Sequence, residues 1–303
     1  MKINLHLSSK ILILLIVNIC VAAAVLFLYF KFQEIKTVGG ANTSSYSFSF
    51  LPKEVVEQIN LGSRAFIIYE PATRSIVAGR NEKFRFAPAS SAKIMAAIIV
   101  LKHYNLNQVL TASGLAELGP DNSKMGLYDG EQMTVENLLC GMMLPSGNDA
   151  AFVLARNFPG GIPAFVFEMN KLASKLGLSN THFIDPDGYD DANFTTAYDL
   201  ARLGAYGMKI PQFEKIVGTR KKVVTDATGN INHVLENLNI LLGKNGVNGI
   251  KTGFTQEAGG VLVTSVNSQE RNYIVVVLGS RDRFLDTESV LDKGVLRIHE
   301  FSY

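Results

Sequence analysis

The sequence predicts an α+β domain in which both ends of the domain supply strands to one antiparallel sheet of about five strands. Two segments of strand-like composition, 65–70 and 75–78, lie near the start of this domain. Three more, 247–254, 260–266 and 272–278, lie near its end, and helical patterns fill the middle. Strands at both ends of a helical stretch favour a single sheet that is flanked by helices, with a helical lobe inserted.

The first 36 residues are expected to form a transmembrane signal anchor. Residues 11–30 are almost entirely apolar, with Asn18 as the one strongly polar interruption, and about 20 helical residues suffice to cross a bilayer core. A cleaved signal peptide is the alternative, but this apolar segment is longer than the hydrophobic region of such peptides. Residues 37–52 are rich in Gly, Ser, Thr and Asn, which predicts a flexible stalk before a folded domain over 53–303.

The elements of this domain follow from local patterns. Residues 71–74 supply the turn of an opening hairpin, and an Ala-rich apolar segment preceded by Pro88 predicts a helix over 90–103. The pattern predicts further helices at 134–144, 150–157, 162–176 and 195–207. An amphipathic helix over 284–301 is expected to close the chain.

Composition and spacing argue against several classes of function. The chain has 303 residues and a net charge of +2, without a basic stripe interleaved with aromatic residues, so nucleic-acid binding is not expected. Cys20 lies in the apolar segment and Cys140 in the domain, which leaves no intradomain disulfide. The acidic segment 185–191 lacks the spacing of a calcium loop, and the histidines form no metal motif. A solvated turn is expected there, and neither a metal nor a cofactor.

Ser90 and Lys93 form the first candidate catalytic pair. Residues three apart on a helix share a face, so the hydroxyl and the amine would project together near the start of the predicted helix. Burial or a second cation would lower the pKa of Lys93 until its amine could accept the proton of Ser90. An isolated Ser-x-x-Lys match is usually a surface pair without such a role, so further motifs must support it.

Ser146 and Asn148 form the second candidate, on a loop between two predicted helices. A hydroxyl and an amide two residues apart could relay a proton to a leaving amine and hold a substrate amide. The same Ser-x-Asn spacing recurs at Ser265 and Asn267, which the strand pattern makes a chance match.

Lys251, Thr252 and Gly253 form the third candidate, on the first strand of the C-terminal set. The missing side chain of Gly253 would let a ligand lie along the strand edge. Lys251 would supply a second cation that lowers the pKa of Lys93 and attracts a carboxylate, to which Thr252 would donate a hydrogen bond. A phosphate-binding loop is excluded because Ile250 interrupts the required Gly-Lys-Thr run.

Ser-x-x-Lys, Ser-x-Asn and Lys-Thr-Gly in this order resemble the signature shared by penicillin-binding proteins and serine β-lactamases. The residues around them, at 88–90, 144–151, 195–200 and 249–255, resemble those of the low-molecular-mass D-alanyl-D-alanine carboxypeptidases. The likeness extends over about 61–301 and implies the DD-peptidase fold. It implies that a peptidoglycan stem peptide acylates the nucleophile at its terminal D-alanyl-D-alanine bond, that water releases the acyl group, and that β-lactams bind covalently.

The resemblance also implies roles for individual residues. The catalytic set is Ser90, Lys93 and Ser146. The substrate-binding set is Asn148, Lys251, Thr252, Gly253, Phe254, Thr255 and Arg283. The oxyanion hole would be formed by the backbone N–H groups of Ser90 and Phe254. Arg283 would help to hold the terminal carboxylate, and Arg281 is a nearby alternative for that role.

Three alternative functions remain open. The chain stops soon after the catalytic domain, as in the penicillin-binding endopeptidases, which use the same motifs to cut cross-links. A β-lactamase would need a deacylating base, but no Glu-x-x-Leu-Asn motif lies between the second and third motifs. An inactive wall-binding scaffold is disfavoured by the intact motifs.

The expected location follows from the expected substrate. Basic residues flank the apolar segment on both sides and do not decide its orientation. A peptidoglycan substrate places the catalytic domain outside the bacterial cytoplasmic membrane. The sequence therefore predicts a single-pass membrane protein whose catalytic domain is on the periplasmic or cell-wall side.

Overall fold

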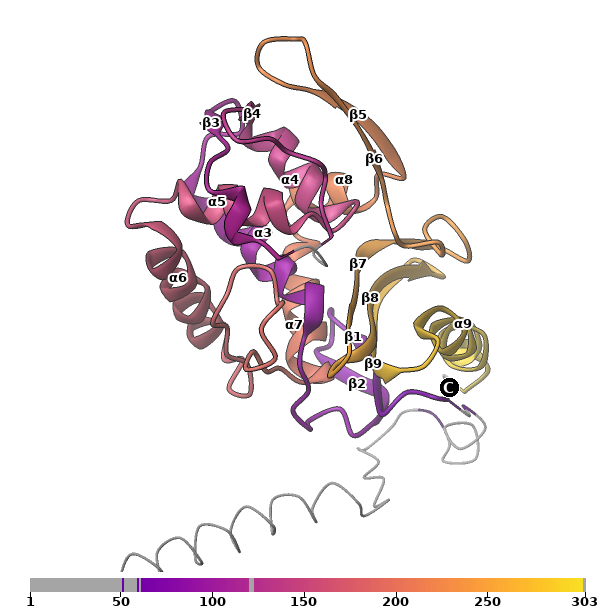
Figure 1. Cartoon of the computed structure of the whole chain (residues 1–303). Helices are drawn as coiled ribbons and strands as arrows, with labels where there is room; N and C mark the ends of the chain where they lie inside the picture. The colour runs from indigo at the N-terminus through magenta and orange to yellow at the C-terminus, as the bar shows by residue number, and fades with distance from the viewer. Residues whose placement is uncertain (1–50, 52–58, 60, 120–122, 302–303) are drawn as a thin grey trace, which may run out of the picture. The chain divides into compact units, whose positions relative to one another are not determined.

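The computed structural model describes residues 51, 59, 61–119 and 123–301, all of which belong to one unit of the chain. Its centre is a five-stranded antiparallel sheet with the strand order β2-β1-β9-β8-β7 (Figure 1). These strands are β1 (Ala65–Glu70), β2 (Ser75–Arg80), β7 (Val247–Thr255), β8 (Gly259–Ser268) and β9 (Arg271–Ser280). The α+β prediction and the sheet drawn from both ends of the domain are therefore confirmed.

Helices cover both faces of this sheet (Figure 1). The lobe on one face contains α3 (Lys93–His103), α4 (Val135–Met143), α5 (Asn148–Arg156), α6 (Gly161–Lys175), α7 (Ala197–Gly207) and α8 (Pro211–Val217). The opposite face is covered by α9 (Arg283–Lys293). Two small hairpins join β3 (Val109–Thr111) to β4 (Gln132–Thr134) and β5 (Lys221–Thr225) to β6 (Asn232–Glu236). Short 3-10 helices are η2 (Ala89–Ala92), η3 (Leu115–Glu117) and η4 (Val295–Phe301).

The sheet is buried on both faces because successive side chains of a strand point in opposite directions. In β1, Ile67 packs into the hydrophobic cluster of the helical lobe. Its neighbours Phe66 and Ile68 pack into a second cluster, which includes Val290 and Leu291 of α9. This double burial explains why β1 and β9 contain nearly continuous apolar runs rather than alternating ones.

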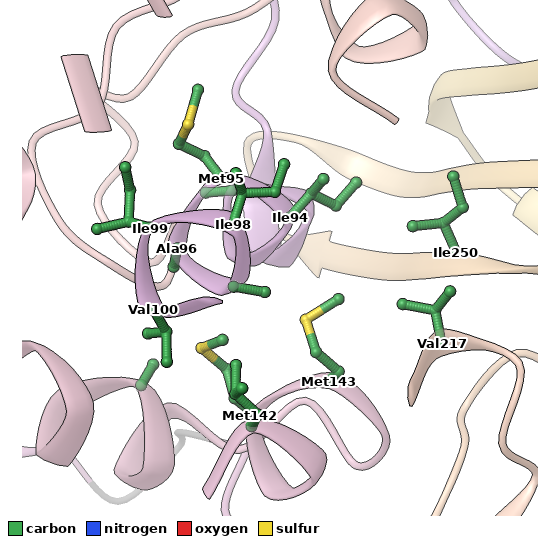
Figure 2. Packing of buried hydrophobic residues seen from close by; sticks show 14 of the residues in the cluster. Ile94, Met95, Ala96, Ile98, Ile99, Val100, Met142, Met143, Val217 and Ile250 are labelled. Atoms are coloured by element: carbon green, nitrogen blue, oxygen red, sulfur yellow. The ribbon is translucent and has the colours of Figure 1, made fainter. Parts of the chain in front are cut away.

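Helix α3 crosses the middle of the helical lobe, and its residues from Lys93 to Val100 are buried on every side. Figure 2 shows its Ile94 and Ile98 beside Met143 of α4, with Val217 and Ile250 on the facing segments. The start of α3 is therefore fixed by packing on all sides, and this is where the first candidate pair lies.

Two helix predictions need correction. The helix expected over 90–103 begins as α3 only at Lys93, and Ser90 lies in the preceding η2. The closing helix expected over 284–301 ends at Lys293 and continues as η4. Gly294 lies between the two. Only glycine fits at this position, because a Cβ there would lie 2.5 Å from Ile68 and 2.6 Å from the carbonyl oxygen of Val290. Sequence patterns also missed α8 and both small hairpins.

The predicted anchor over 1–36 lies outside the described residues, as does the stalk over 37–52 apart from Leu51. Leu51 is buried in the second hydrophobic cluster. Within the part of the chain that the structure describes, no single helix has the length and apolar character to cross a membrane. Helices α5 and α6, which meet at a 98° bend, meet that requirement only as a pair.

Candidate active site

The backbone around Ser90 is held in an unusual conformation. Ala89 has φ +45°, a left-handed value that is costly for a residue with a side chain. Gly188 packs so closely that a Cβ on it would overlap the carbonyl oxygen of Ala89. The hydroxyl of Ser91 donates a 2.6 Å hydrogen bond to the carbonyl of Pro88. These contacts fix the position of the Ser90 backbone at the start of α3.

The amine of Lys93 lies at the centre of this site and is completely buried. Its Nζ lies 3.0 Å from Oγ of Ser90, 2.6 Å from Oδ1 of Asn148 and 2.9 Å from the backbone carbonyl of Asp187. Both carbonyl oxygens can only accept hydrogen bonds, so each takes an N–H of the amine. In the neutral amine, the lone pair is then left for the third neighbour. That neighbour is the Ser90 hydroxyl, which can donate its proton.

Burial lowers the pKa of Lys93 from 10.5 to about 8. The negative charges of Asp187, Asp185 and Asp149 act in the opposite direction and keep this pKa from falling further. With a pKa of about 8, roughly a tenth of the amine is neutral at pH 7, far more than for an ordinary lysine. Lys93 is therefore able to exchange a proton with Ser90, which an ordinary surface lysine does only at high pH.

The loop with Ser146 and Asn148 is shaped by its glycine. Ser146 is buried and has φ +65°. At Gly147 a Cβ would lie 2.9 Å from the carbonyl oxygen of Gly141 and 3.0 Å from the amide of Met125, so only glycine fits. Asn148 follows as the first residue of α5, which aims its amide oxygen at Lys93. The second motif is thus joined to the first by a direct contact.

Asp149 is a buried residue of this site that motif reasoning missed. Its carboxylate accepts hydrogen bonds from the backbone N–H groups of Met125, Gly126, Leu127 and Ala150, at 2.9 to 3.1 Å. These contacts tie the neighbouring 125–127 segment to the first turn of α5. An acidic residue just after the Ser-x-Asn motif was the available signal, since carboxylates favour helix N-termini.

Strand β7 brings the third motif against the first. A Cβ on Gly253 would lie 3.1 Å from the backbone nitrogen of Ser90 and 3.1 Å from Cβ of Ala89. The glycine therefore permits β7 to run directly beside η2. Thr252 and Lys251 precede it on this edge strand, and both are buried.

Lys251 is the second buried cation of the site. Its Nζ donates a 3.0 Å hydrogen bond to the carbonyl of Thr252. Burial lowers its pKa well below 10.5, and the positive charges of Lys93 and Arg283 lower it further. Repulsion between two cations is mutual, so each lysine disfavours the charged form of the other while it is itself charged. The main cause at Lys93 is burial.

Arg283 is the arginine that faces this cluster. It is partly buried at the start of α9, and burial lowers its pKa. Its Nε is buried and has no hydrogen-bond partner within the described residues. Arg281 is exposed instead. An unsatisfied guanidinium nitrogen close to Lys251 is suited to a ligand carboxylate.

The end of β7 is open to solvent. Phe254 is 58% exposed, one residue beyond the contact with Ser90. The hydroxyl of Thr255 donates to Asp191 at 3.3 Å and accepts a hydrogen bond from the amide of Ala258 at 3.0 Å. The acidic segment therefore reaches the third motif as well as Lys93.

The acidic segment 185–191 is not the solvated turn expected from its composition. Asp187 is only 7% exposed, and its carbonyl is one of the acceptors for Lys93. The carboxylate of Asp185 accepts hydrogen bonds from the backbone N–H groups of Asp187, Gly188 and Asp190. Burial raises the pKa of Asp187 to about 6. This segment is a hydrogen-bonded wall of the site.

The arrangement contains the parts of a nucleophilic site. Ser90 has a neighbouring amine that can take its proton, and Lys251 interacts electrostatically with both Lys93 and Arg283. Within the described part of the chain, no group of three or more His, Cys, Asp or Glu side chains could hold a metal ion. The chemistry available from these residues is acyl transfer through a serine ester.

Comparison with known proteins connects these residues to one family. Residues 53–282 match the family model described as D-alanyl-D-alanine carboxypeptidase. The chain is 30% identical over 240 residues to the D-alanyl-D-alanine carboxypeptidase DacF of Bacillus subtilis, and the match covers 76% of this chain and 61% of DacF. It is 32% identical over 246 residues to the D-alanyl-D-alanine endopeptidase of Pseudomonas aeruginosa, covering 76% of each protein. The chain thus spans less than two thirds of DacF.

Among solved structures, the Streptomyces K15 DD-transpeptidase superposes with a TM-score of 0.73. The two sequences are 30% identical, and the match covers 78% of this chain and 98% of the transpeptidase. The likeness therefore extends over nearly the whole of that catalytic domain, including the sheet and the helical lobe that hold the three motifs.

Proposed function

This chain belongs to the D-alanyl-D-alanine carboxypeptidase family, and on that premise we propose that it removes the terminal D-alanine from peptidoglycan stem pentapeptides. The reaction passes through an acyl-enzyme on Ser90, and penicillins acylate the same residue. The observation that carries this proposal is the set of three contacts at the Lys93 amine. Two of them fix the N–H groups, which leaves the lone pair of the neutral amine for Ser90.

In the first step, Lys93 takes the hydroxyl proton as Ser90 Oγ attacks the carbonyl between the two D-alanines. The negative charge that develops on the carbonyl oxygen is stabilised by the backbone N–H groups of Ser90 and Phe254. Such an oxyanion hole requires both donors to be fixed in advance. The contact between Gly253 and the Ser90 backbone supports this arrangement.

The terminal carboxylate of the substrate binds near Lys251, Thr252 and Arg283. The unpaired Nε of Arg283 and the shared positive field at Lys251 support this assignment. Asn148 and Thr255 are assigned to contacts with the peptide. A carboxylate placed here satisfies charges that the described residues leave without a counter-ion.

Ser146 then relays the proton held by Lys93 to the leaving amine of D-alanine, so that both Ser146 and Lys93 are neutral again. The C–N bond breaks, and the ester on Ser90 remains. Water then attacks the ester carbonyl and gives its proton to Lys93, which returns that proton to Ser90 Oγ. The free acid of the shortened peptide leaves, so atoms and charges balance over the cycle.

Cross-link cleavage is the second candidate activity. The observation that favours it is the match to the Pseudomonas aeruginosa endopeptidase, of which this chain covers 76%. Cutting a cross-link uses the same acyl transfer, with a D-alanyl bond to a neighbouring peptide in place of terminal D-alanine. The two activities differ only in what the site accepts on the leaving-group side of the scissile bond.

The proposed location is the outer side of a bacterial cytoplasmic membrane, with residues 11–30 as a single transmembrane anchor. The apolar composition of this segment and the location of peptidoglycan support the assignment. Protease treatment of intact spheroplasts is expected to degrade the catalytic domain. Protection of the domain would contradict this location.

Covalent labelling tests the proposed activity. The full chain in detergent is incubated with a fluorescent penicillin, and the labelled fraction is measured on a denaturing gel. We expect one label per molecule in the wild type and none in Ser90→Ala, while Ser179→Ala, at an exposed serine, labels normally. Labelling of Ser90→Ala would exclude this residue as the nucleophile.

Product analysis then separates the candidate activities. The chain is incubated with a monomeric pentapeptide muropeptide and with a cross-linked dimer, and the products are identified by mass. We expect loss of one alanine from the monomer. Cleavage of the dimer alone would assign the endopeptidase activity instead, and rapid hydrolysis of penicillin without a lasting adduct would indicate a β-lactamase.

A further inference from the structure

A cavity outside the candidate active site lies where the β1–β2 turn meets α6 and α7. Its volume is about 310 Å³. It is lined by residues of the turn and of the C-terminal parts of both helices, chiefly Tyr69, Arg74, Lys175, Arg202, Tyr206 and Lys209. None of these residues belongs to the three motifs. The cavity therefore requires a separate explanation.

The charge of this cavity is one-sided. Four of the described residues that line the cavity are cationic, and none of its described lining residues is Asp or Glu. Arg74, Lys175 and Lys209 form no ion pair with any described residue. The whole chain carries a net charge of only +2, so these cations are concentrated locally. A concave site with charges of one sign focuses the electric field and attracts counter-ions.

Arg202 is the fixed member of this set. Its guanidinium donates to the carbonyl oxygens of Leu176 at 2.6 Å and Gly177 at 2.8 Å, and lies 3.9 Å from Asp199. Asp199 offsets part of its charge. The same contacts hold the guanidinium at the cavity before any ligand binds, so that binding an anion costs little further side-chain entropy at Arg202. A preorganised donor of this kind lowers the cost of binding an anion.

The rest of the cavity wall suits the carbon part of a ligand. Tyr69 is almost fully buried, and its ring packs edge to face on Tyr198 with a centroid distance of 6.1 Å. Pro71 and Leu176 add apolar surface, and the ring of Tyr206 completes the lining. Small-molecule sites combine such surfaces with a few fixed polar groups, in cavities of about 300 to 1,000 Å³.

We propose that this cavity binds a small organic phosphate ester, with its phosphate oxygens on the four cations and its carbon part against Tyr69 and Tyr206. A phosphate group offers more acceptor oxygens and more negative charge than a carboxylate, which matches several converging cations. The ester is either a soluble phosphomonoester or the phosphodiester head group of a lipid or polymer. This site is independent of the acyl-transfer chemistry at Ser90.

Calorimetric titration of the full chain in a non-ionic detergent tests this proposal. The probes are glycerol 3-phosphate as the monoester and glycerophosphoglycerol as the diester, with glycerol as the uncharged control. We expect saturable binding of at least one ester and none of glycerol. Tighter binding of the monoester assigns a soluble ligand, and tighter binding of the diester assigns a head group.

Matched charge variants locate the binding site. Lys175→Gln with Lys209→Gln removes two charges from the cavity and is expected to weaken ester binding by about tenfold or more. Lys83→Gln with Lys102→Gln removes two exposed charges elsewhere and is expected to leave the affinity unchanged. Equal weakening in both double variants, or binding of glycerol as tight as that of the esters, would overturn the proposal. So would the absence of binding by both esters in the wild type.

Discussion

The two buried lysines of the site, one at the start of α3 and one on strand β7, differ in their surroundings. Lys93 is 0% exposed and Lys251 is 2% exposed, so burial lowers the pKa of both. Lys93 has three oxygen neighbours from three different segments. Among the described residues, Lys251 has a single hydrogen-bond partner, the carbonyl of Thr252 in its own strand.

This difference shows that burial alone does not assign a chemical role. At Lys93 the two carbonyl acceptors orient the amine toward Ser90, which suits a proton acceptor. At Lys251 the neighbouring cations Lys93 and Arg283 disfavour a charged amine until an anion arrives. A substrate carboxylate would raise the pKa of Lys251 and stabilise its charged form. We therefore expect Lys93 to act in catalysis and Lys251 mainly in binding.

The largest expected effect comes from removing the Lys93 amine. Lys93→Met keeps the length and apolar stem of the side chain but cannot accept a proton. We expect acylation of Ser90 by a fluorescent penicillin to slow by about 10²- to 10⁴-fold, the usual contribution of a general base. Lys102→Met, an exposed position on the same helix, is the control and should acylate at the wild-type rate. Circular dichroism checks that both variants are folded.

Retention of more than a tenth of the wild-type acylation rate in Lys93→Met would remove the proposed difference between the two lysines. Another group would then have to accept the proton of Ser90.

An intermediate effect is expected from Lys251→Met. Loss of a charge-assisted contact with the substrate carboxylate costs about 1.5 to 3 kcal/mol, which corresponds to an increase in KM of roughly 10- to 150-fold. The kcat for D-alanine release should change much less. A substrate whose terminal carboxyl is amidated supplies the control, because the variant and the wild type should then have similar KM values.

A larger effect of Lys251→Met on kcat than on KM would instead assign Lys251 to the chemical step. The comparison of the two lysines would then need revision.

The smallest of these effects is expected from Gly253→Ala, which tests the contact between strand β7 and the backbone at Ser90. The added Cβ would lie 3.1 Å from the Ser90 nitrogen, so strand β7 must shift by a few tenths of an ångström. We expect acylation to slow by about tenfold, because small misplacements at a reacting centre are costly. Gly62→Ala is the matched control, since its Cβ would have no neighbour closer than 3.6 Å. Equal rates in both variants would show that the close approach of β7 is unnecessary.

The sequence predicted the architecture because apolar patterns determine which segments are buried. The β1 and β9 strands were found from their apolar composition, and a single sheet built from both ends of the domain followed from their positions. The small hairpin β5–β6 was missed because Val223 and Val234 point into solvent, 59% exposed each. Such a strand pair does not produce the alternation that marks a half-buried strand.

Motif spacing predicted which residues lie together, but not how they are oriented. The hydroxyl and amine of the first motif meet although Ser90 lies in a 3-10 turn rather than in the α-helix. The acceptor from Asp187 was missed because it is a backbone carbonyl, which any residue type can provide. Spacing also did not predict that burial is the main cause of the lowered pKa of Lys93, because burial depends on the packing around the amine.

The central claim, that neutral Lys93 takes the proton of Ser90, is tested most directly by the pH dependence of acylation. Because burial places the pKa of Lys93 at about 8, the neutral amine is scarce below that pH. The second-order rate of labelling by a fluorescent penicillin should rise by about tenfold per pH unit up to pH about 8 and then level off. A rate that is constant between pH 6 and pH 9, or that falls over this range, would contradict it.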